Sequence, residues 1–260
     1  MKPEVMAQSG FAFLDRAPFL GIAHRGGNEI WPENTMAAFQ DAVDLGYDTL
    51  ETDVRATRDG VLLAFHDDNF RRMAGRPGHI EDSDYRALKD VKVGGTESLP
   101  LLEDILSAWP TVCLNIEPKH DSAVRPLIAV IRKTKALDRV CVGSFSGPRL
   151  QRLREALGPG LCTAMCPSEI VRLRLASYGL PVGRFQAACV QVPVARKGVT
   201  IVDRRFIAAA KARNLPIHVW TVNEAPEMKK LINMGVRGIM TDKLRVLKNV
   251  LEECGLWLGR

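Results

Sequence analysis

The alternation of short apolar runs with longer amphipathic stretches is the feature that most constrains the fold of this chain. Such alternation is typical of βα units that build a largely parallel sheet. The length of 260 residues matches one eight-stranded barrel. We therefore expect an α/β fold, a TIM-type (β/α)8 barrel that forms a single domain over residues 1–260. The expected strands are residues 21–24, 48–54, 112–118, 139–145, 161–165, 188–194, 217–222 and 238–242.

Helix signals follow several of these runs. In residues 32–46, Asn34 or Thr35 can cap a helix whose apolar residues recur every three or four positions. Residues 61–67 form an extra strand-like run, and residues of about 68–100 have weak periodicity and several glycines. We interpret this last segment as a small excursion after the second strand, with one or two short helices. Further helices are expected at residues 122–137, 148–158, 203–214 and 225–235.

The charge of the chain restricts its partners. A net charge of +6 and a pI near 9.1 favour anionic ligands such as phosphates, and leave weak association with an anionic membrane surface open. A nucleic-acid partner is disfavoured, because the basic residues are scattered over expected helices, aromatic residues make up only 6% and no basic tail is present.

Six cysteines occur mostly within apolar strand-like runs, where a cysteine is usually a small, reduced core residue. Cys162 and Cys166 are close in sequence but lack a second pair, which argues against a zinc site between them. The stretch of residues 1–21 has one lysine and acidic residues that interrupt its apolar runs, so neither a secretory signal nor a membrane span is expected. These features together predict a cytoplasmic protein.

The first expected strand ends in His24 and Arg25, followed by Gly26 and Gly27. In a barrel of this type the ligand site lies at the carboxyl ends of the strands. His24 and Arg25 are therefore expected at the mouth of the barrel, where the two glycines let the backbone turn away.

Two carboxylates follow on the second expected strand. Glu51 and Asp53 are two positions apart, so both side chains emerge on one face. Two like charges so close together need a partner, and hard oxygen ligands suit Mg²⁺ or Ca²⁺. For an isolated pair, acidic residues that simply face solvent are an equally good interpretation.

A second histidine is expected beside these carboxylates. Asp59 and Gly60 form a strong hairpin signal, and if Arg58 pairs with Val61 then His66 is placed across from Asp53. A buried structural histidine is the alternative.

The third expected strand ends in Glu117 and Lys119, on one face around Pro118, which adds a carboxylate and a cation at the rim. Without the other residues, an exposed turn would explain them equally well. Trp220 approaches the rim of a later strand, where it can form an apolar wall for a small polyol or belong to the core.

The segments "AHRGGNEIWPENTMAAF", "LETDVRATRDGVLLAFHD", "NIEPK", "HVWTVN" and "GIMTD" together resemble the glycerophosphodiester phosphodiesterase family, over about residues 21–251. This resemblance implies a barrel enzyme that uses one divalent metal ion to hydrolyse glycerophosphodiesters to sn-glycerol 3-phosphate and an alcohol. It also implies the site residues: Glu51, Asp53 and Glu117 for the metal, Arg25 and Lys119 for the phosphate, and His24 and His66 for proton transfer.

We expect His24 to act as the base and His66 as the acid; the attacking group can be water or the glycerol 2-hydroxyl. The chain departs from the family pattern at Arg72, Met73 and Ala74, where an arginine and two threonines are common, and at Pro118. Three alternatives are a lysophospholipase D with the same site, a non-catalytic anion-binding barrel and a nucleic-acid-binding protein. The sequence does not indicate an oligomeric state.

Overall fold

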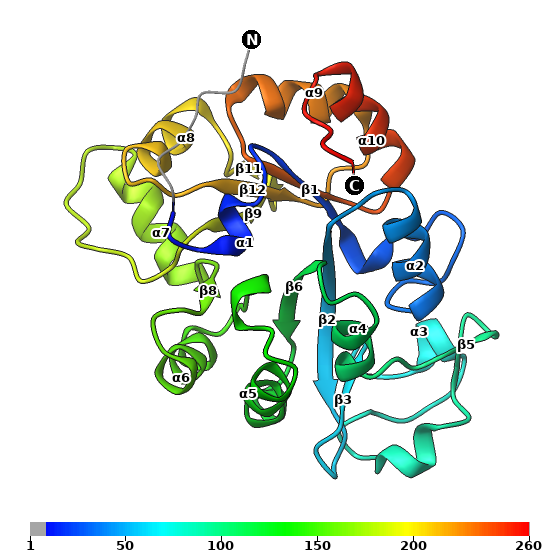
Figure 1. The fold of residues 1–260 in the computed structure, drawn as a ribbon. Helices are drawn as coiled ribbons and strands as arrows, with labels where there is room; N and C mark the ends of the chain where they lie inside the picture. Colours follow the sequence, from blue (N-terminus) through cyan, green and yellow to red (C-terminus); the bar gives the residue numbers. More distant parts are fainter. Residues whose placement is uncertain (1–8, 260) are drawn as a thin grey trace.

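The structure, a computed structural model, describes residues 9–259 and confirms the parallel barrel (Figure 1). Each of its eight parallel strands overlaps one of the eight runs expected from the sequence. These strands are β1 (Leu20–Ala23), β2 (Thr49–Ala56), β6 (Cys113–Pro118), β7 (Val140–Val142), β8 (Cys162–Thr163), β9 (Val190–Pro193), β12 (Ile217–Trp220) and β13 (Gly238–Thr241).

The strands lie in the order β8, β7, β6, β2, β1, β13, β12, β9, so chain neighbours are also sheet neighbours. The two ends of this order meet at a parallel bridge between Ala164 and Cys189. There Ala188 N donates to Thr163 O at 2.8 Å, and Met165 N donates to Cys189 O at 3.0 Å. This contact closes the ring.

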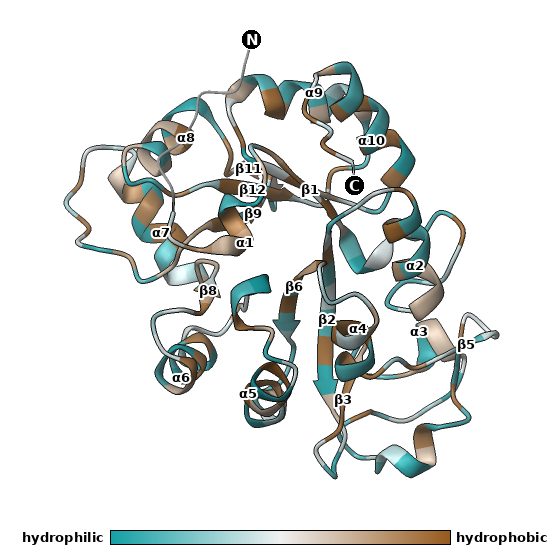
Figure 2. Ribbon diagram, in the orientation of Figure 1, coloured by the Kyte–Doolittle hydropathy of each residue, from teal (hydrophilic) through white to brown (hydrophobic). Residues whose placement is uncertain are grey.

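Helices cover the outside of the ring and turn their apolar faces toward it (Figure 2). The five helices expected from the sequence are present, and Thr35 is the cap of the first, since its hydroxyl accepts from Ala38 N at 3.2 Å. Three others, over residues 102–108, 167–176 and 244–253, had no counterpart among the expected helices. The helices are α2 (Met36–Asp44), α4 (Leu102–Ala108), α5 (Val124–Lys133), α6 (Gly147–Leu157), α7 (Pro167–Ala176), α8 (Arg204–Lys211), α9 (Ala225–Met234) and α10 (Leu244–Glu253), with short 3-10 turns at Asp121–Ala123 and Leu137–Arg139.

The amino end of the barrel is closed by the short helix α1 (Ala12–Asp15). Its buried Phe13 and Leu14 belong to one apolar cluster with Leu20, Ile22 and Met240 of strands β1 and β13. Because this end is filled with apolar side chains, polar chemistry is left to the opposite end, where the strands finish.

The hairpin after β2 has a different register from the expected one. Strand β3 (Leu62–Ala64) is antiparallel to β2, but Arg55 pairs with Leu63, one position away from the prediction. The reason is a three-residue loop: Thr57 N donates to Val61 O at 2.9 Å, and the Thr57 hydroxyl donates to the Asp59 carboxylate. His66 is therefore not placed opposite Asp53 by the ladder, and the expected register is wrong.

The excursion beside the barrel has its own small core. As expected, it contains two short helical segments, α3 (Arg71–Ala74) and Tyr85–Leu88, together with the two-stranded pair β4 (Lys92–Val93) and β5 (Glu97–Ser98). A second hairpin, β10 (Ala195–Arg196) and β11 (Val199–Thr200), follows β9. The core of the excursion consists of Leu63, Phe65, Phe70, Ile80, Leu88, Val91, Val93 and Leu99.

All six cysteines are free thiols, and five are buried. Cys254 is exposed at the end of α10. Among residues 9–259, no helix has the length and apolarity needed to cross a membrane. The expectation about a secretory signal falls in part on residues 1–8, which lie outside the described residues.

Candidate active site

The turn that follows β1 carries the first two site residues. His24 and Arg25 lie in a short 3-10 turn (His24–Gly26), and both following glycines have positive φ, 79° and 84°. A Cβ on Gly26 would lie 2.9 Å from the backbone of Ala38, and one on Gly27 would lie 2.8 Å from Leu244 Cγ. The two glycines thus allow the turn to pack closely against α2 and α10.

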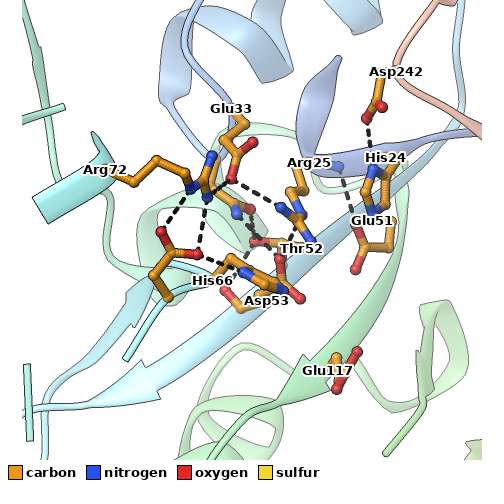
Figure 3. Close-up of polar contacts among 12 residues, drawn as sticks. His24, Arg25, Glu33, Glu51, Thr52, Asp53, His66, Arg72, Glu117 and Asp242 are labelled. Carbon is orange, nitrogen blue, oxygen red and sulfur yellow. Dashed lines mark hydrogen bonds and ion pairs between the residues drawn. The ribbon is translucent and has the colours of Figure 1, made fainter. Parts of the chain in front are cut away.

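His24 is held by an aspartate from the far end of the chain. Its Nδ1 lies 2.6 Å from Oδ1 of Asp242, which directly follows β13. Asn223 fixes that carboxylate, because its Nδ2 donates to Asp242 Oδ2 at 3.1 Å and its Oδ1 accepts from Asp242 N at 3.0 Å. A carboxylate only accepts, so Nδ1 carries the proton and Nε2 points toward Glu51, 3.9 Å from its Oε2 (Figure 3).

His66 has a matching arrangement. Its Nδ1 donates to Asp67 Oδ1 at 2.7 Å, and Arg72 of α3 donates to both oxygens of the same carboxylate, at 2.7 and 3.0 Å. These hydrogen bonds from Arg72 lower the pKa of Asp67 to about 2. An ionised Asp67 keeps the proton of His66 on Nδ1, which leaves Nε2 for the site.

The carboxylates of β2 point into the barrel mouth and are buried, with Glu51 4% and Asp53 1% exposed. The interpretation of a solvent-facing pair is thereby excluded. Asp53 is ion-paired through Oδ2 with Arg25 Nε at 2.9 Å and through Oδ1 with Lys119 Nζ at 2.8 Å. Lys119 also lies 3.0 Å from Oε2 of Glu117, which is next to Asp53 in the register of β2 and β6.

The structure therefore brings together His24, Arg25, Glu51, Asp53, His66, Glu117 and Lys119. Glu51 and Asp53 lie within β2, and the other five lie at or just after the carboxyl end of a strand; Figure 3 labels all of them except Lys119. His66 reaches Asp53 despite the shifted register, because Phe65 N donates to Asp53 O at 2.9 Å and keeps the chain alongside β2. The charge of Asp53 acts on the pKa of His66.

Burial and mutual repulsion make this cluster receptive to a cation. Burial and the neighbouring charge of Asp53 raise the pKa of Glu51 to about 7. Burial likewise raises the pKa of Glu117. Burial disfavours the charge on Asp53 too, but Lys119 and Arg25 outweigh it and lower the pKa of Asp53. The three carboxylates do not bring one oxygen each within 4.8 Å of one another.

The two histidines have pKa shifts of opposite sign. Burial disfavours the charged form of His24, but Glu51 and the hydrogen bond to Asp242 outweigh it and raise its pKa. Burial of His66 is only partly offset by Asp53 and Asp67, so its pKa is lowered. A raised pKa suits a proton donor and a lowered one a proton acceptor. The largest raising effect on His24 comes from Glu51. In the site without a bound cation, these directions favour the reverse of the expected roles for His24 and His66.

Trp220 lies at the edge of the mouth and is half-buried. Its ring is 6.0 Å from that of Phe145, edge to face, and Phe145 is 51% exposed. The guanidinium of Arg196, in the β10–β11 hairpin, lies 5.9 Å from the Phe145 ring. Trp220 is therefore part of an aromatic wall and not only of the core.

Several contacting residues were not predicted from the sequence. Asn34 is no helix cap: its Oδ1 accepts from the Thr52 hydroxyl at 2.7 Å and its Nδ2 donates to Asp53 at 3.3 Å. Glu33 accepts from Arg25 at 2.9 Å and from Arg72 at 2.6 Å. For Asp67 and Asp242, the only local signal in the sequence was a carboxylate close to the end of a strand. The residues missed are Glu33, Asn34, Asp67, Arg72 and Asp242.

Comparison with known proteins identifies relatives of this chain. A relative from Mycobacterium tuberculosis, described as "Probable glycerophosphodiester phosphodiesterase 2", is 35% identical over 95% of this chain and 96% of its own. The lysophospholipase D of Rattus norvegicus is 27% identical over 89% of this chain and 85% of its own.

Solved structures share the fold. A phosphodiesterase from Oleispira antarctica, in complex with the product sn-glycerol-3-phosphate, has a TM-score of 0.76 and 22% identity, over 91% of this chain and 98% of its own. A glycerophosphodiester phosphodiesterase from Agrobacterium tumefaciens has a TM-score of 0.73 and 23% identity, over 90% and 99%. The model of the glycerophosphoryl diester phosphodiesterase family matches residues 24–246, and this chain belongs to that family.

Proposed function

We propose that the chain hydrolyses glycerophosphodiesters to sn-glycerol 3-phosphate and an alcohol. One observation carries the proposal: two histidines, each oriented by an aspartate on Nδ1, flank one cluster of carboxylates and cations. This arrangement provides a proton acceptor and a proton donor around an anion-binding centre, which is what phosphodiester hydrolysis requires. Membership of the family supports the same reaction.

Glu51, Asp53 and Glu117 are proposed to hold one divalent cation, Mg²⁺ or Ca²⁺. The residues fit such an ion because they offer hard oxygen donors. Burial raises the pKa of both Glu51 and Glu117, so their ionised forms lack compensating positive charge, which a cation would supply. When bound, the cation would neutralise charge on the phosphodiester and lower the pKa of a coordinated hydroxyl.

The phosphate is proposed to bind between Arg25 and Lys119. Arg25 Nε lies 2.9 Å from Asp53 Oδ2, and Arg25 Nη1 donates to Glu33 at 2.9 Å, so the two carboxylates hold the guanidinium at the mouth. The second cation, Lys119, is held at the rim by Asp53 and Glu117.

Nε2 of His66 is proposed to remove the proton of the attacking hydroxyl, and Nε2 of His24 to protonate the leaving alcohol. The lowered pKa of His66 and the raised pKa of His24 support this order. Water and the glycerol 2-hydroxyl are both compatible with the site as the attacking group.

Hydrolysis of lysophospholipids is the second candidate, because the aromatic wall of Trp220 and the exposed Phe145 can contact the acyl chain of such a substrate. The named activity of the Rattus norvegicus relative points the same way. We propose a small glycerophosphodiester as the main partner of the site. Weak attraction of the protein to an anionic membrane surface and a cytoplasmic location are further proposals.

A substrate panel tests these functions. Purified protein is incubated with glycerophosphodiesters of different head groups and with lysophospholipids, each with and without chelator, and sn-glycerol 3-phosphate, lysophosphatidic acid and free alcohol are quantified. We expect metal-dependent release of sn-glycerol 3-phosphate. Turnover of lysophospholipids alone would favour the second candidate, and no turnover of either class would favour a non-catalytic anion-binding barrel.

A further inference from the structure

The interior of the barrel holds a second cluster of reactive side chains below the active site. Cys141 of β7, Cys162 of β8 and Cys189, directly before β9, point toward one another. Their sulfurs all lie within 4.8 Å of one another, and Cys141 and Cys189 are 3.8 Å apart. Among the described residues, no other three metal-ligating side chains gather so closely.

The composition of this layer is unusual for a barrel core. Such layers are dominated by bulky branched side chains, whereas here thiols from adjacent strands belong to one apolar cluster with Ile22 and Met240. The three thiols are at most 2% exposed. Burial raises the pKa of Cys141 well above that of an ordinary thiol.

The spacing of the sulfurs suits one thiophilic ion. Zn²⁺ binds thiolate sulfur at about 2.3 Å, which places two sulfurs of a tetrahedral site ~3.8 Å apart. That is the separation of Cys141 and Cys189, and the other pairs need only a modest contraction to reach it. Soft thiolates select ions such as Zn²⁺ and Cu⁺ over Mg²⁺ or Ca²⁺, so this cluster and the carboxylate site above it would bind different metals.

The location gives such an ion a structural role. Strands β7 and β8 share only two register pairs, and β8 meets β9 through the single bridge between Ala164 and Cys189. The three sulfurs span this seam, where few backbone pairs join the strands. A cation bound by all three would add a link between these strands.

We propose that Cys141, Cys162 and Cys189 form a binding site for one thiophilic d10 cation of the Zn²⁺ or Cu⁺ type, which closes the barrel between β7 and β9. Each thiol gives up its proton to solvent as its sulfur binds, so up to three protons are released per ion. Gln191, the next inward-facing residue on β9, covers the cluster on the side of the active site, with its Nε2 3.9 Å from Cys141 Sγ.

The test uses Cd²⁺ as a spectroscopic probe. The full chain is unfolded with reductant and chelator, refolded with Cd²⁺ and excess Mg²⁺, and desalted. Thiolate-to-cadmium absorption and cadmium per chain are then measured. We expect one thiolate-bound ion per chain, lost in Cys141→Ala, Cys162→Ala and Cys189→Ala. The matched controls are Cys166→Ala, a buried thiol outside the cluster, and Cys254→Ala, the exposed thiol; both should retain the ion.

A second measurement covers the case in which a cluster variant does not fold. Wild-type protein refolded with and without Zn²⁺ is partly unfolded in denaturant and alkylated, and the modified thiols are mapped by mass spectrometry. Protection of Cys141, Cys162 and Cys189 together, with a higher unfolding midpoint, supports the site. Absent thiolate absorption in wild-type protein, absorption lost only in Cys254→Ala, or equal alkylation with and without Zn²⁺ would overturn it.

Discussion

Asp242 accepts a 2.6 Å hydrogen bond from Nδ1 of His24, although 218 residues separate the two in the chain. The contact exists because β1 and β13 are neighbours in the closed ring, with Ala23 paired to Thr241. It fixes which nitrogen of His24 faces the site, and the chemistry proposed for His24 depends on it.

Asp242→Asn should lower kcat by about 10²-fold or more while leaving KM for a glycerophosphodiester nearly unchanged, because the amide no longer fixes the Nδ1–H tautomer. The pKa of His24 should also fall with the loss of the carboxylate, which would shift the alkaline limb of the pH profile to lower pH. Asp44→Asn, in α2, is the control. A variant with normal kcat and an unchanged profile would show that Asp242 is only structural.

His24→Ala and His66→Ala should each reduce kcat by roughly 10²-fold or more, with little change in thermal unfolding, because each imidazole serves one proton transfer. The double variant should be far less impaired than the product of the two losses, since both groups act on one transition state. Near wild-type turnover in His24→Ala would refute the proposed mechanism. The measurements are kcat and thermal unfolding of all three variants.

Removal of divalent ions should abolish turnover, because the buried carboxylates would lose the cation that offsets their repulsion. Glu117→Gln should weaken metal affinity and keep the fold, since Glu117 lies at the rim. Activity is measured after dialysis against chelator and again after addition of Mg²⁺ or Ca²⁺. Full activity in excess chelator would contradict a metal-dependent reaction.

The pH dependence of kcat/KM should be bell-shaped. His66 must be neutral to accept a proton, so activity should rise with pH through a pKa below the usual histidine value of 6.5. His24 must be protonated to donate, so activity should fall above a pKa higher than 6.5. His66→Ala should remove the acidic limb. Loss of the alkaline limb in that variant would instead support the opposite assignment of acid and base.

Arg72→Ala should destabilise the protein at neutral pH by about 1 kcal/mol, since its ion pairs are partly exposed. The depressed pKa of Asp67 contributes stability that is present above the unfolded value of roughly 3.9 and is lost as pH falls toward about 2. Wild-type protein should therefore lose stability more steeply in this range than the variant. Urea midpoints measured across this pH range, with Arg71→Ala as control, test the relationship.

Much of the fold could be predicted because its signals are local. Runs such as residues 48–54 and 112–118 show their strand character within a few positions, and eight of them in alternation with helices leave few architectures other than a barrel. The site residues His24 and Glu117 could be found for the same reason, since each lies where its own strand ends, and Glu51 could be found because it shares one face of its strand with Asp53.

The sequence by itself determined the eight parallel strands, five of the helices and the seven ionisable groups predicted at the mouth. Only the tertiary structure decided how those groups are paired. The register of β2 and β3 depended on one extra residue in the loop between them. The contact of His24 with Asp242 depended on closure of the ring. The thiol cluster depended on the seam between β8 and β9. The physical reason is that periodicity reports which face a residue occupies, whereas distances between strands, burial and pKa shifts arise only when distant segments pack together.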